Sequence, residues 1–498
     1  MLLEPGETRG FDKFPSVRRH PPFTPFHNQK SLLTQPAWAP CTPPSRSPYR
    51  FPATFSSSVA MWPLTGEPDT DIPVIPELWR GTAEVTALTS TQHDQGIRVY
   101  NQGLMDLLNT AARICMSDPA QTGFIARTAA SQRRAAKTRE RWEEQGTHVP
   151  PLLIISVTSE CNLNCKGCYA RAQHHDSTAG PGPGPGPGAL GVSGEGGNAR
   201  VRAGGAAGTA GASGTSGTVG ATGIAGRDMD DATLRAVLDN ASELGISVAL
   251  LAGGEPLTRP GLLDIASDYP DILFPVFTNG LLIDDDLATR MRRQRNVIPV
   301  LSLEGNQEIT DDRRGAGVWS RVRGAAQALR RARVFFGSSF TVRSDTLDAL
   351  TDEHFIAEMI GLGCRLFFFV EYVPVQPGTD SWELTQDQRA ELACRVGALR
   401  SSTPALYVAF PGDEEATGGC LAAGRGFVHI SARGDVEPCP FAPYSDSSVC
   451  GVSLRDALKS PLLEAIRADR DQFGDTSGGC ALWRRREQVR ALLQRNRA

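Results

Sequence analysis

Short apolar runs alternate with amphipathic stretches from residue 151 onward. Runs rich in β-branched and aromatic residues predict strands at 152–157, 246–252, 272–277, 297–303, 335–342 and 366–370. Between and after these runs, apolar residues recur three and four positions apart, which predicts helices at 229–244, 258–268, 284–295, 316–333, 347–361 and 384–400. This alternation indicates βαβ units around a parallel sheet, either a partial barrel or an open α/β sheet, with ligands at the carboxyl ends of the strands.

The segments outside this alternation differ in composition. Residues 1–58 are rich in Pro, Ser and Arg without periodicity, and residues 176–227 are rich in Gly, Ala and Pro, so we expect both to be disordered. Residues 59–149 are expected to be mainly helical, with helices at 101–117 and 119–145. A basic run from Arg133 to Arg141 in the second helix predicts a solvated helix face.

Charge and composition exclude several classes of protein. The 498 residues include 51 Lys and Arg against 55 Asp and Glu, so the formal net charge of −4 gives no electrostatic basis for nucleic-acid binding. No apolar run approaches the roughly 20 residues of a membrane span. The first residues also lack the apolar segment of a secretory signal, so we expect a cytoplasmic protein without a membrane span. In a reducing compartment, clustered cysteines bind metal more often than they form disulfides.

The densest cysteine cluster directly follows the first predicted strand. Cys161, Cys165 and Cys168 form a C-x3-C-x2-C pattern, whose short spacing lets one loop aim three thiolates at a common point. Three thiolates fit an iron–sulfur cluster in which one iron has no protein ligand and can bind a substrate or cosubstrate. The alternative is a structural zinc site with His174 or His175 as the fourth ligand.

Further motifs at strand ends give this cluster a family resemblance. The stretch 161–169, CNLNCKGCY, is similar to the CxxxCxxC signature of the radical SAM superfamily. The sequence LAGGEP at 251–256 ends the second strand and resembles the family's GGEP element, whose glycines permit close backbone approach. Later strand ends carry Thr278-Asn279-Gly280, Ser302-Leu303-Glu304-Gly305 followed by Asp311-Asp312-Arg313-Arg314-Gly315, then Arg343, then Glu371-Tyr372-Val373-Pro374. Glu304 stands where the family's SxDG element has Asp.

The resemblance covers residues 150–375 apart from the insertion and implies both a fold and a site. The fold would be a partial (β/α)6 TIM-like barrel, with a small C-terminal Cys-rich α+β domain and a helical N-terminal segment. Cys161, Cys165 and Cys168 would bind a [4Fe–4S] cluster, and S-adenosylmethionine (SAM) would chelate its open iron. The expected cofactor-binding residues are Gly253, Gly254, Glu255 and Pro256 at the methionine amino group, Tyr169 beside the adenine, Thr278 and Asn279, Ser302 and Glu304 facing the ribose, and Arg343 on the methionine carboxylate.

The region 404–498, after a predicted core at 150–403, has a different character. Residues 426–439 predict a hairpin, and helices are predicted at 453–470 and 481–495. The spacing of Cys420, Gly434 and Cys439 is similar to the opening of the SPASM and twitch extensions, which hold auxiliary iron–sulfur clusters. The tight CxxC-type group of the full SPASM pattern is absent. We therefore expect a twitch-like domain with one auxiliary cluster, with Cys420, Cys439 and Cys480 as ligands and Cys450 as a further candidate.

The leading hypothesis is thus a radical SAM enzyme that cleaves SAM by one electron. The resulting 5′-deoxyadenosyl radical would abstract hydrogen from an unidentified substrate, either a peptide or a small molecule such as a tetrapyrrole. The expected partner is a flavodoxin- or ferredoxin-type electron donor, and no catalytic residue is assigned. The alternative is a zinc-stabilised or catalytically degenerate binding protein on the same scaffold.

Overall fold

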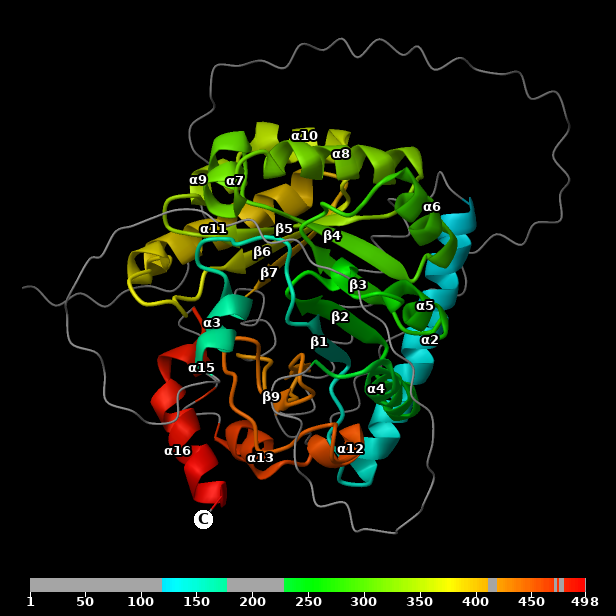
Figure 1. Ribbon diagram of the computed structural model, residues 1–498, viewed down its shortest axis with the longest axis vertical. Coiled ribbons are helices and arrows are strands. Elements are labelled where there is room, and N and C mark those ends of the chain that lie inside the picture. The colour runs from blue at the N-terminus through cyan, green and yellow to red at the C-terminus, as the bar shows by residue number, and fades with distance from the viewer. Residues whose placement is uncertain (1–118, 177–227, 411–418, 470–472, 474–478, 498) are drawn as a thin grey trace, which may run out of the picture. The chain divides into compact units, whose positions relative to one another are not determined.

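The computed structural model describes residues 119–176, 228–410, 419–469, 473 and 479–497. The predicted extension at 1–58, the predicted helix at 101–117 and the insertion from residue 177 to 227 lie outside the described residues. All the elements below therefore come from the remaining part of the chain, and the labels follow Figure 1.

The central element is one sheet of nine strands in the order β7-β6-β5-β4-β3-β2-β1-β8-β9. Its strands are β1 (Leu152–Thr158), β2 (Val248–Gly253), β3 (Phe274–Thr278), β4 (Val297–Leu303), β5 (Gly337–Val342), β6 (Leu366–Glu371), β7 (Leu406–Phe410), β8 (Phe427–Ile430) and β9 (Val436–Glu437). Neighbouring strands from β7 to β8 are parallel, and only β8 and β9 pair in the antiparallel sense. The six predicted strands are confirmed, and two further strands, β7 and β8, join them in the parallel sense.

Helices connect the strands as the periodicity predicts. They are α4 (Asp231–Leu244), α5 (Leu262–Ser267), α6 (Asp285–Gln294), α7 (Gln307–Arg314), α8 (Val318–Arg331), α9 (Leu347–Leu350), α10 (Glu353–Gly361) and α11 (Gln386–Ser402), with short 3-10 helices η1 (Pro256–Thr258) and η2 (Asp380–Trp382). The single helix predicted at 347–361 is wrong, because the side chain of Asp352 caps a new helix by accepting a hydrogen bond from the Phe355 N–H.

The two faces of the strands differ in packing. Along β1, Leu153 and Ile155 are fully buried, whereas Leu152 and Ile154 are only half-buried. The same alternation occurs in β6, where Phe367 is fully buried and Phe368 is half-buried. Since successive side chains of a strand point to opposite faces, one face packs on the helices and the other lines a cavity. Residues from β1 through β8 line that one cavity, as in a partial barrel.

Helix α2 (Pro119–Glu144) packs against the start of this barrel. Ile125 joins a small apolar cluster with Leu366 and Leu406, at the first residues of β6 and β7. The basic run of α2 is predicted to form a solvated face, and this prediction is wrong for Arg139. Its side chain is buried and donates a 2.5 Å hydrogen bond to the carbonyl of Gly245. Arg134 in the same run is exposed.

The C-terminal region is built onto the same sheet through β8, which pairs with β1. The predicted hairpin is confirmed as β8 and β9, with Gly434 at a φ of 87° in the turn between them. The helices that follow are α12 (Leu454–Ala457), α13 (Pro461–Ala468), α15 (Ala481–Arg484) and α16 (Arg486–Arg497), and they gather at one end of the picture in Figure 1. Ser460 caps α13, which divides the single helix predicted at 453–470.

Candidate active site

The loop that follows β1 carries three cysteines and is held at its base by hydrogen bonds. The carboxylate of Asp228 accepts hydrogen bonds from the Thr158 hydroxyl at 2.8 Å and from the Ser159 N–H at 2.7 Å. Further along the loop, the Lys166 N–H donates to the carbonyl of Arg313 at 2.9 Å. The loop ends where Tyr169 begins α3 (Tyr169–Asp176). These contacts fix the loop between the end of β1 and α7.

The structure brings the predicted cysteines Cys161, Cys165 and Cys168 together. Burial raises the pKa of the Cys161 thiol, and the neighbouring sulfurs of Cys165 and Cys168 raise it further. Burial also raises the pKa of Cys165, against the opposing charges of Arg314 and Arg313. A thiolate at this place therefore needs a positive partner, which a metal centre or these guanidinium groups can supply.

The segment Gly253-Gly254-Glu255 lies directly against the cysteine loop. The Gly254 N–H donates to the carbonyl of Thr158 at 2.8 Å, and the Glu255 N–H donates to that of Glu160 at 2.7 Å. A Cβ atom on Gly254 would lie 2.0 Å from the Glu160 carbonyl oxygen, and one on Gly253 would lie 2.4 Å from that of Thr158. The two glycines are therefore required by the close approach of the two backbones.

Glu255 is a buried carboxylate held from three sides. It accepts hydrogen bonds from the Thr278 hydroxyl at 2.7 Å, the Asn279 N–H at 2.7 Å and the Leu257 N–H at 3.1 Å. Burial raises its pKa, while these hydrogen bonds oppose the shift. Thr278 and Asn279 thus position Glu255, and Pro256 starts the 3-10 helix beside it.

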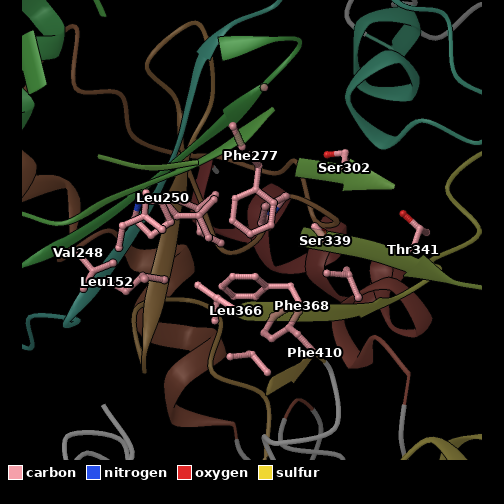
Figure 2. A pocket seen from close by; sticks show the side chains of 18 of the residues that line it. Leu152, Val248, Leu250, Phe277, Ser302, Ser339, Thr341, Leu366, Phe368 and Phe410 are labelled. Carbon is pink, nitrogen blue, oxygen red and sulfur yellow. The ribbon is translucent and has the colours of Figure 1, made fainter. Parts of the chain in front are cut away.

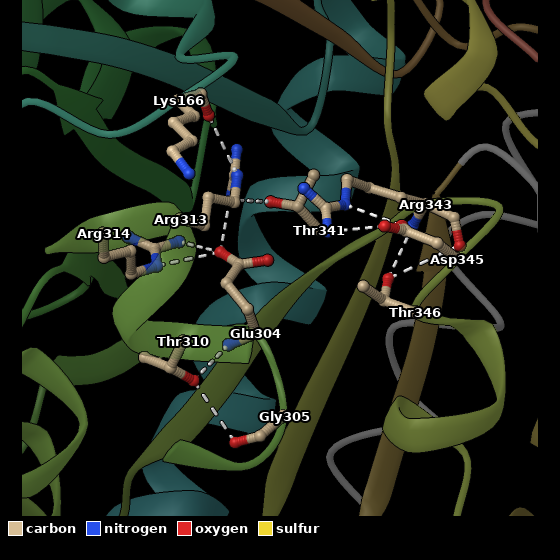
Figure 3. Close-up of polar contacts among 10 residues, drawn as sticks. All are labelled: Lys166, Glu304, Gly305, Thr310, Arg313, Arg314, Thr341, Arg343, Asp345 and Thr346. Carbon is tan, nitrogen blue, oxygen red and sulfur yellow. Dashed lines mark hydrogen bonds and ion pairs between the residues drawn. The ribbon is translucent and has the colours of Figure 1, made fainter. Parts of the chain in front are cut away.

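A second polar group surrounds Glu304 (Figure 3). Its carboxylate pairs with both Arg313 and Arg314, and its Oε2 atom is buried without a hydrogen-bond partner in the described part of the chain. Arg313 also donates to the Thr341 hydroxyl at 2.9 Å. This cluster brings two cations next to Cys165.

Arg343 is paired within the chain. Its guanidinium donates two hydrogen bonds to Asp345, both 2.9 Å long, and stacks over the ring of Trp382 at 4.6 Å. Arg313 and Arg314 line the cavity beside the cysteines, whereas Arg343 is not among its described lining residues. Both arginines belong to the Asp311–Gly315 stretch of the sequence. Their direction toward the cavity depends on how α7 packs on the cysteine loop.

The cavity has a volume of about 760 Å³ and touches both the cysteine loop and the strand interiors. Among the predicted site residues, it is lined by Cys161, Cys165, Cys168, Tyr169, Gly253, Gly254, Glu255, Asn279 and Ser302. These residues come from loops or strand ends far apart in the sequence. Their convergence at the carboxyl ends of the strands is the arrangement expected of an α/β active site.

Tyr169 lies between this site and the C-terminal cysteines. Burial raises its pKa, with the sulfurs of Cys168 and Cys439 adding to the shift, and its hydroxyl contacts the backbone of Gly253. Its ring packs edge to face against Phe441, with centroids 5.5 Å apart. Tyr169 therefore joins the cysteine loop to the segment that carries Cys439.

The C-terminal cysteines fall into two places. Cys439 is buried, and its pKa is raised well above the ordinary value, first by burial and then by Cys480 and Cys420 nearby. Cys450 is exposed, and its thiol donates to the carbonyl of Arg433 at 3.3 Å. The structure thus groups Cys420, Cys439 and Cys480 and places Cys450 at the hairpin turn. In the described residues, no three His, Cys, Asp or Glu side chains are arranged to hold a single metal ion.

Comparison with known proteins identifies the domain that contains the site. Residues 155–359 match the model of the Radical SAM superfamily. This part of the chain is a radical SAM domain. It runs from β1 to α10 and includes the cysteine loop, Glu255 and the Glu304 cluster. The prediction of a radical SAM enzyme is confirmed.

The relatives of the radical SAM domain have names that describe different reactions. The chain is 26% identical to an AdoMet-dependent heme synthase of Methanosarcina barkeri over 273 residues, which are 49% of this chain and 76% of the relative. It is 26% identical to the PqqA peptide cyclase of Gluconobacter oxydans, over 43% of this chain and 62% of the relative. Among solved structures, Streptococcus suis SuiB bound to its precursor peptide SuiA matches with a TM-score of 0.47 and 15% identity, over 69% of this chain and 72% of that one.

No helix in the described part of the chain is long and apolar enough to cross a membrane.

Proposed function

We propose that this enzyme cleaves SAM reductively at Cys161, Cys165 and Cys168, and that the resulting 5′-deoxyadenosyl radical abstracts hydrogen from a substrate in the cavity. One observation carries the proposal: the three thiols, the Gly253–Glu255 segment and the 760 Å³ cavity meet at the carboxyl ends of β1 and β2. A [4Fe–4S] cluster bound by the three thiolates would supply the electron that splits the sulfonium of SAM.

The residues present fit such a cluster. The loop offers three sulfur ligands, and soft thiolates favour iron–sulfur clusters over the hard cations that carboxylates bind. The Arg313 and Arg314 guanidinium groups lower the pKa of Cys165 against its burial, so they favour the thiolate that a metal requires. A cluster with three protein ligands would leave one iron with an open coordination position for the cosubstrate.

Glu255 is suited to receive the methionine ammonium group. A carboxylate has about four acceptor sites, and the chain's own donors occupy three of those on Glu255. The remaining site lies on a cavity-lining side chain, where a charge-assisted hydrogen bond to an ammonium group is favourable.

Ser302 lines the same cavity, consistent with its predicted place near the ribose. Arg313 and Arg314 would attract the methionine carboxylate, while the roles predicted for Glu304, Tyr169 and Arg343 stay predictions.

We further propose that Cys420, Cys439 and Cys480 bind an auxiliary iron–sulfur cluster. Their mutual proximity and the burial of Cys439 support this assignment. The contacts of Cys450, which are with Arg433 and Ser448, give no support for it as a fourth ligand.

The substrate is proposed to be a peptide or a small molecule. The relatives' names include a peptide cyclase and a heme synthase, so both classes have a counterpart among them. We also propose a flavodoxin- or ferredoxin-type electron donor as the partner.

The proposal is tested by anaerobic incubation of the reconstituted full chain with SAM and dithionite. We expect 5′-deoxyadenosine and methionine in equal amounts, since abortive cleavage occurs without substrate. The control is Cys165→Ala, which removes one thiolate and should abolish both products. Wild-type yields no higher than those of Cys165→Ala would overturn the proposal.

A further inference from the structure

The cavity changes character along the strands. Its charged lining residues at the carboxyl ends are Glu255, Arg313, Arg314 and Glu371. The first residues of the strands contribute apolar side chains instead, such as Leu152, Val248 and Leu366. Because a strand rises about 3.3 Å per residue, Leu152 lies roughly 20 Å before Thr158 along β1. The cavity therefore extends from a polar site deep into an apolar interior.

The apolar interior is open rather than packed. Leu250, Phe277 and Phe368 point into it and remain half-buried although they lie in central strands (Figure 2). The rings of Phe277 and Phe368 contact each other with centroids 5.0 Å apart. A TIM barrel normally fills this space with layers of side chains, and engineered apolar cavities of about 150 Å³ already bind benzene. A volume of about 760 Å³ thus has room for more than the cosubstrate alone.

The far end of the cavity is bordered by α2. Phe124, Ile125 and Thr128 of this helix line the cavity at the starts of the strands. Two arginines also line this end, and both bond to the chain: Arg295 donates to Gln121 at 3.0 Å and Arg400 to the Tyr407 carbonyl at 2.9 Å. Between the two ends, the described lining residues carry no charge.

One side of the interior is hydroxylated. Ser302 of β4 and Ser339 of β5 are register partners and both line the cavity, with Thr341 two residues further along β5. Figure 2 shows these hydroxyls on neighbouring strands, beside the phenylalanine rings. A ligand with an apolar body and a hydrogen-bonding edge would be held in one orientation by this arrangement.

We propose that the interior between β1, β2, β3, β6 and β7 binds an uncharged apolar group of the substrate, either an aromatic ring or a branched aliphatic side chain. This chamber, defined by Leu152, Leu250, Phe277, Phe368, Val408 and Phe410, rests on the proposed function for the reaction that it serves. Since Cys161, Cys165 and Cys168 line the same cavity at the carboxyl ends of the strands, C–H bonds of the group that face these ends would lie toward the radical. A cationic group in the same place would lose its hydration, and the Arg295 and Arg400 guanidinium groups at this end would repel it, so the chamber selects against a cation.

The test uses toluene as a probe on the full chain. Isothermal titration should detect toluene binding to the wild type, and at least tenfold weaker binding of benzylammonium. Leu250→Trp fills the chamber and should weaken toluene binding at least tenfold. Leu282→Trp makes the same change at a side chain that is 42% exposed on the surface, and should bind toluene like the wild type. Val408→Phe, a smaller filling change, is the second variant if Leu250→Trp does not fold.

A second readout connects the chamber to the chemistry. With SAM, dithionite and toluene-d8, one electron breaks the C5′–S bond to give methionine and the 5′-deoxyadenosyl radical. The radical takes a methyl deuterium atom, and dithionite and a solvent proton reduce the remaining benzyl radical. We expect singly deuterated 5′-deoxyadenosine from the wild type and Leu282→Trp, and at least tenfold less label from Leu250→Trp.

The outcomes separate the two proposals. Toluene binding that is absent, or equal in wild type and both filling variants, would overturn the chamber. Toluene binding that is lost on filling, without 5′-deoxyadenosine from any variant, would support the chamber and contradict the proposed function. Unlabelled 5′-deoxyadenosine in the presence of bound toluene-d8 would overturn the placement of C–H bonds near the radical.

Discussion

The Nε2 atom of His429 on β8 lies 2.8 Å from the hydroxyl oxygen of Ser156 on β1. Its Nδ1 atom lies 2.7 Å from the carboxylate of Glu437 on β9. All three side chains are buried, so the hydrogen-bonded chain crosses three strands without solvent. Ser156 leads to the loop of Cys161, and Glu437 lies two residues before Cys439. The contact thus joins the strands that lead into both cysteine groups.

Replacement of His429 by Phe should destabilise the protein. The substitution leaves the Ser156 hydroxyl and the Glu437 carboxylate buried without their partner, which costs roughly 2–4 kcal/mol. Urea unfolding of the two chains measures the difference. His354→Phe is the matched control because the His354 side chain is 99% exposed, and it should change the free energy of unfolding by less than about 0.5 kcal/mol. Equal effects of the two variants would contradict a buried structural role for His429.

Replacement of Glu304 by Gln should also lower stability. Glu304 is 1% exposed and is the shared counter-charge of Arg313 and Arg314, so its neutralisation leaves two poorly hydrated cations with a weaker partner. We expect a loss of roughly 3 kcal/mol in the free energy of unfolding. Glu308→Gln changes an exposed carboxylate on α7, the helix that carries Arg313 and Arg314, and serves as the control. A Glu304→Gln variant as stable as Glu308→Gln would refute the assigned pairing.

A methyl group at Gly254 should damage the site. The Cβ atom of alanine would lie 2.0 Å from the carbonyl oxygen of Glu160, so the two loops must separate. Gly254→Ala should lower the iron content after reconstitution to about half of the wild-type value, because the auxiliary cluster keeps its iron. A colorimetric iron assay measures the loss. Gly324→Ala in α8 has no heavy atom within 4 Å of the added carbon and should retain full iron content. Full iron loading of Gly254→Ala would show that the close approach is unnecessary.

The C-terminal cysteines should divide into ligands and a non-ligand. Cys439→Ala should lose about half of the total iron and sulfide, because it removes the buried member of the group with Cys420 and Cys480. Cys450→Ala should retain the wild-type content, since its thiol bonds to the Arg433 carbonyl. Iron and acid-labile sulfide are quantified in parallel. Equal iron losses in the two variants would return Cys450 to the ligand set.

Much of the barrel could be predicted because its signal is local. The apolar run at 297–303 coincides with β4, and the hairpin at 426–439 contains a turn that needs Gly434. The clustering of Cys161, Cys165 and Cys168 follows from their spacing in one loop. In each case the residues that decide the structure are close in sequence.

The rest depends on contacts between distant segments. Arg139 resembles its solvated neighbours in the sequence, and only the packing of α2 on α4 buries it against Gly245. Likewise, Arg313 reaches the cysteines because α7 packs on the loop at Lys166. The sequence of β7 is apolar but carries no signal for its partner strand. Its pairing with β6, which begins with Leu366 opposite Leu406, depends on contacts between segments distant in the sequence.

We propose that Cys161, Cys165 and Cys168 hold a cluster whose open iron binds SAM. Electron paramagnetic resonance of dithionite-reduced Cys439→Ala, which should keep only this cluster, tests it most directly. We expect a reduced [4Fe–4S] signal whose g values shift when SAM is added, and no signal from Cys161→Ala/Cys439→Ala. An absent signal in Cys439→Ala, or one that SAM leaves unchanged, would show that these three cysteines do not hold a SAM-binding cluster.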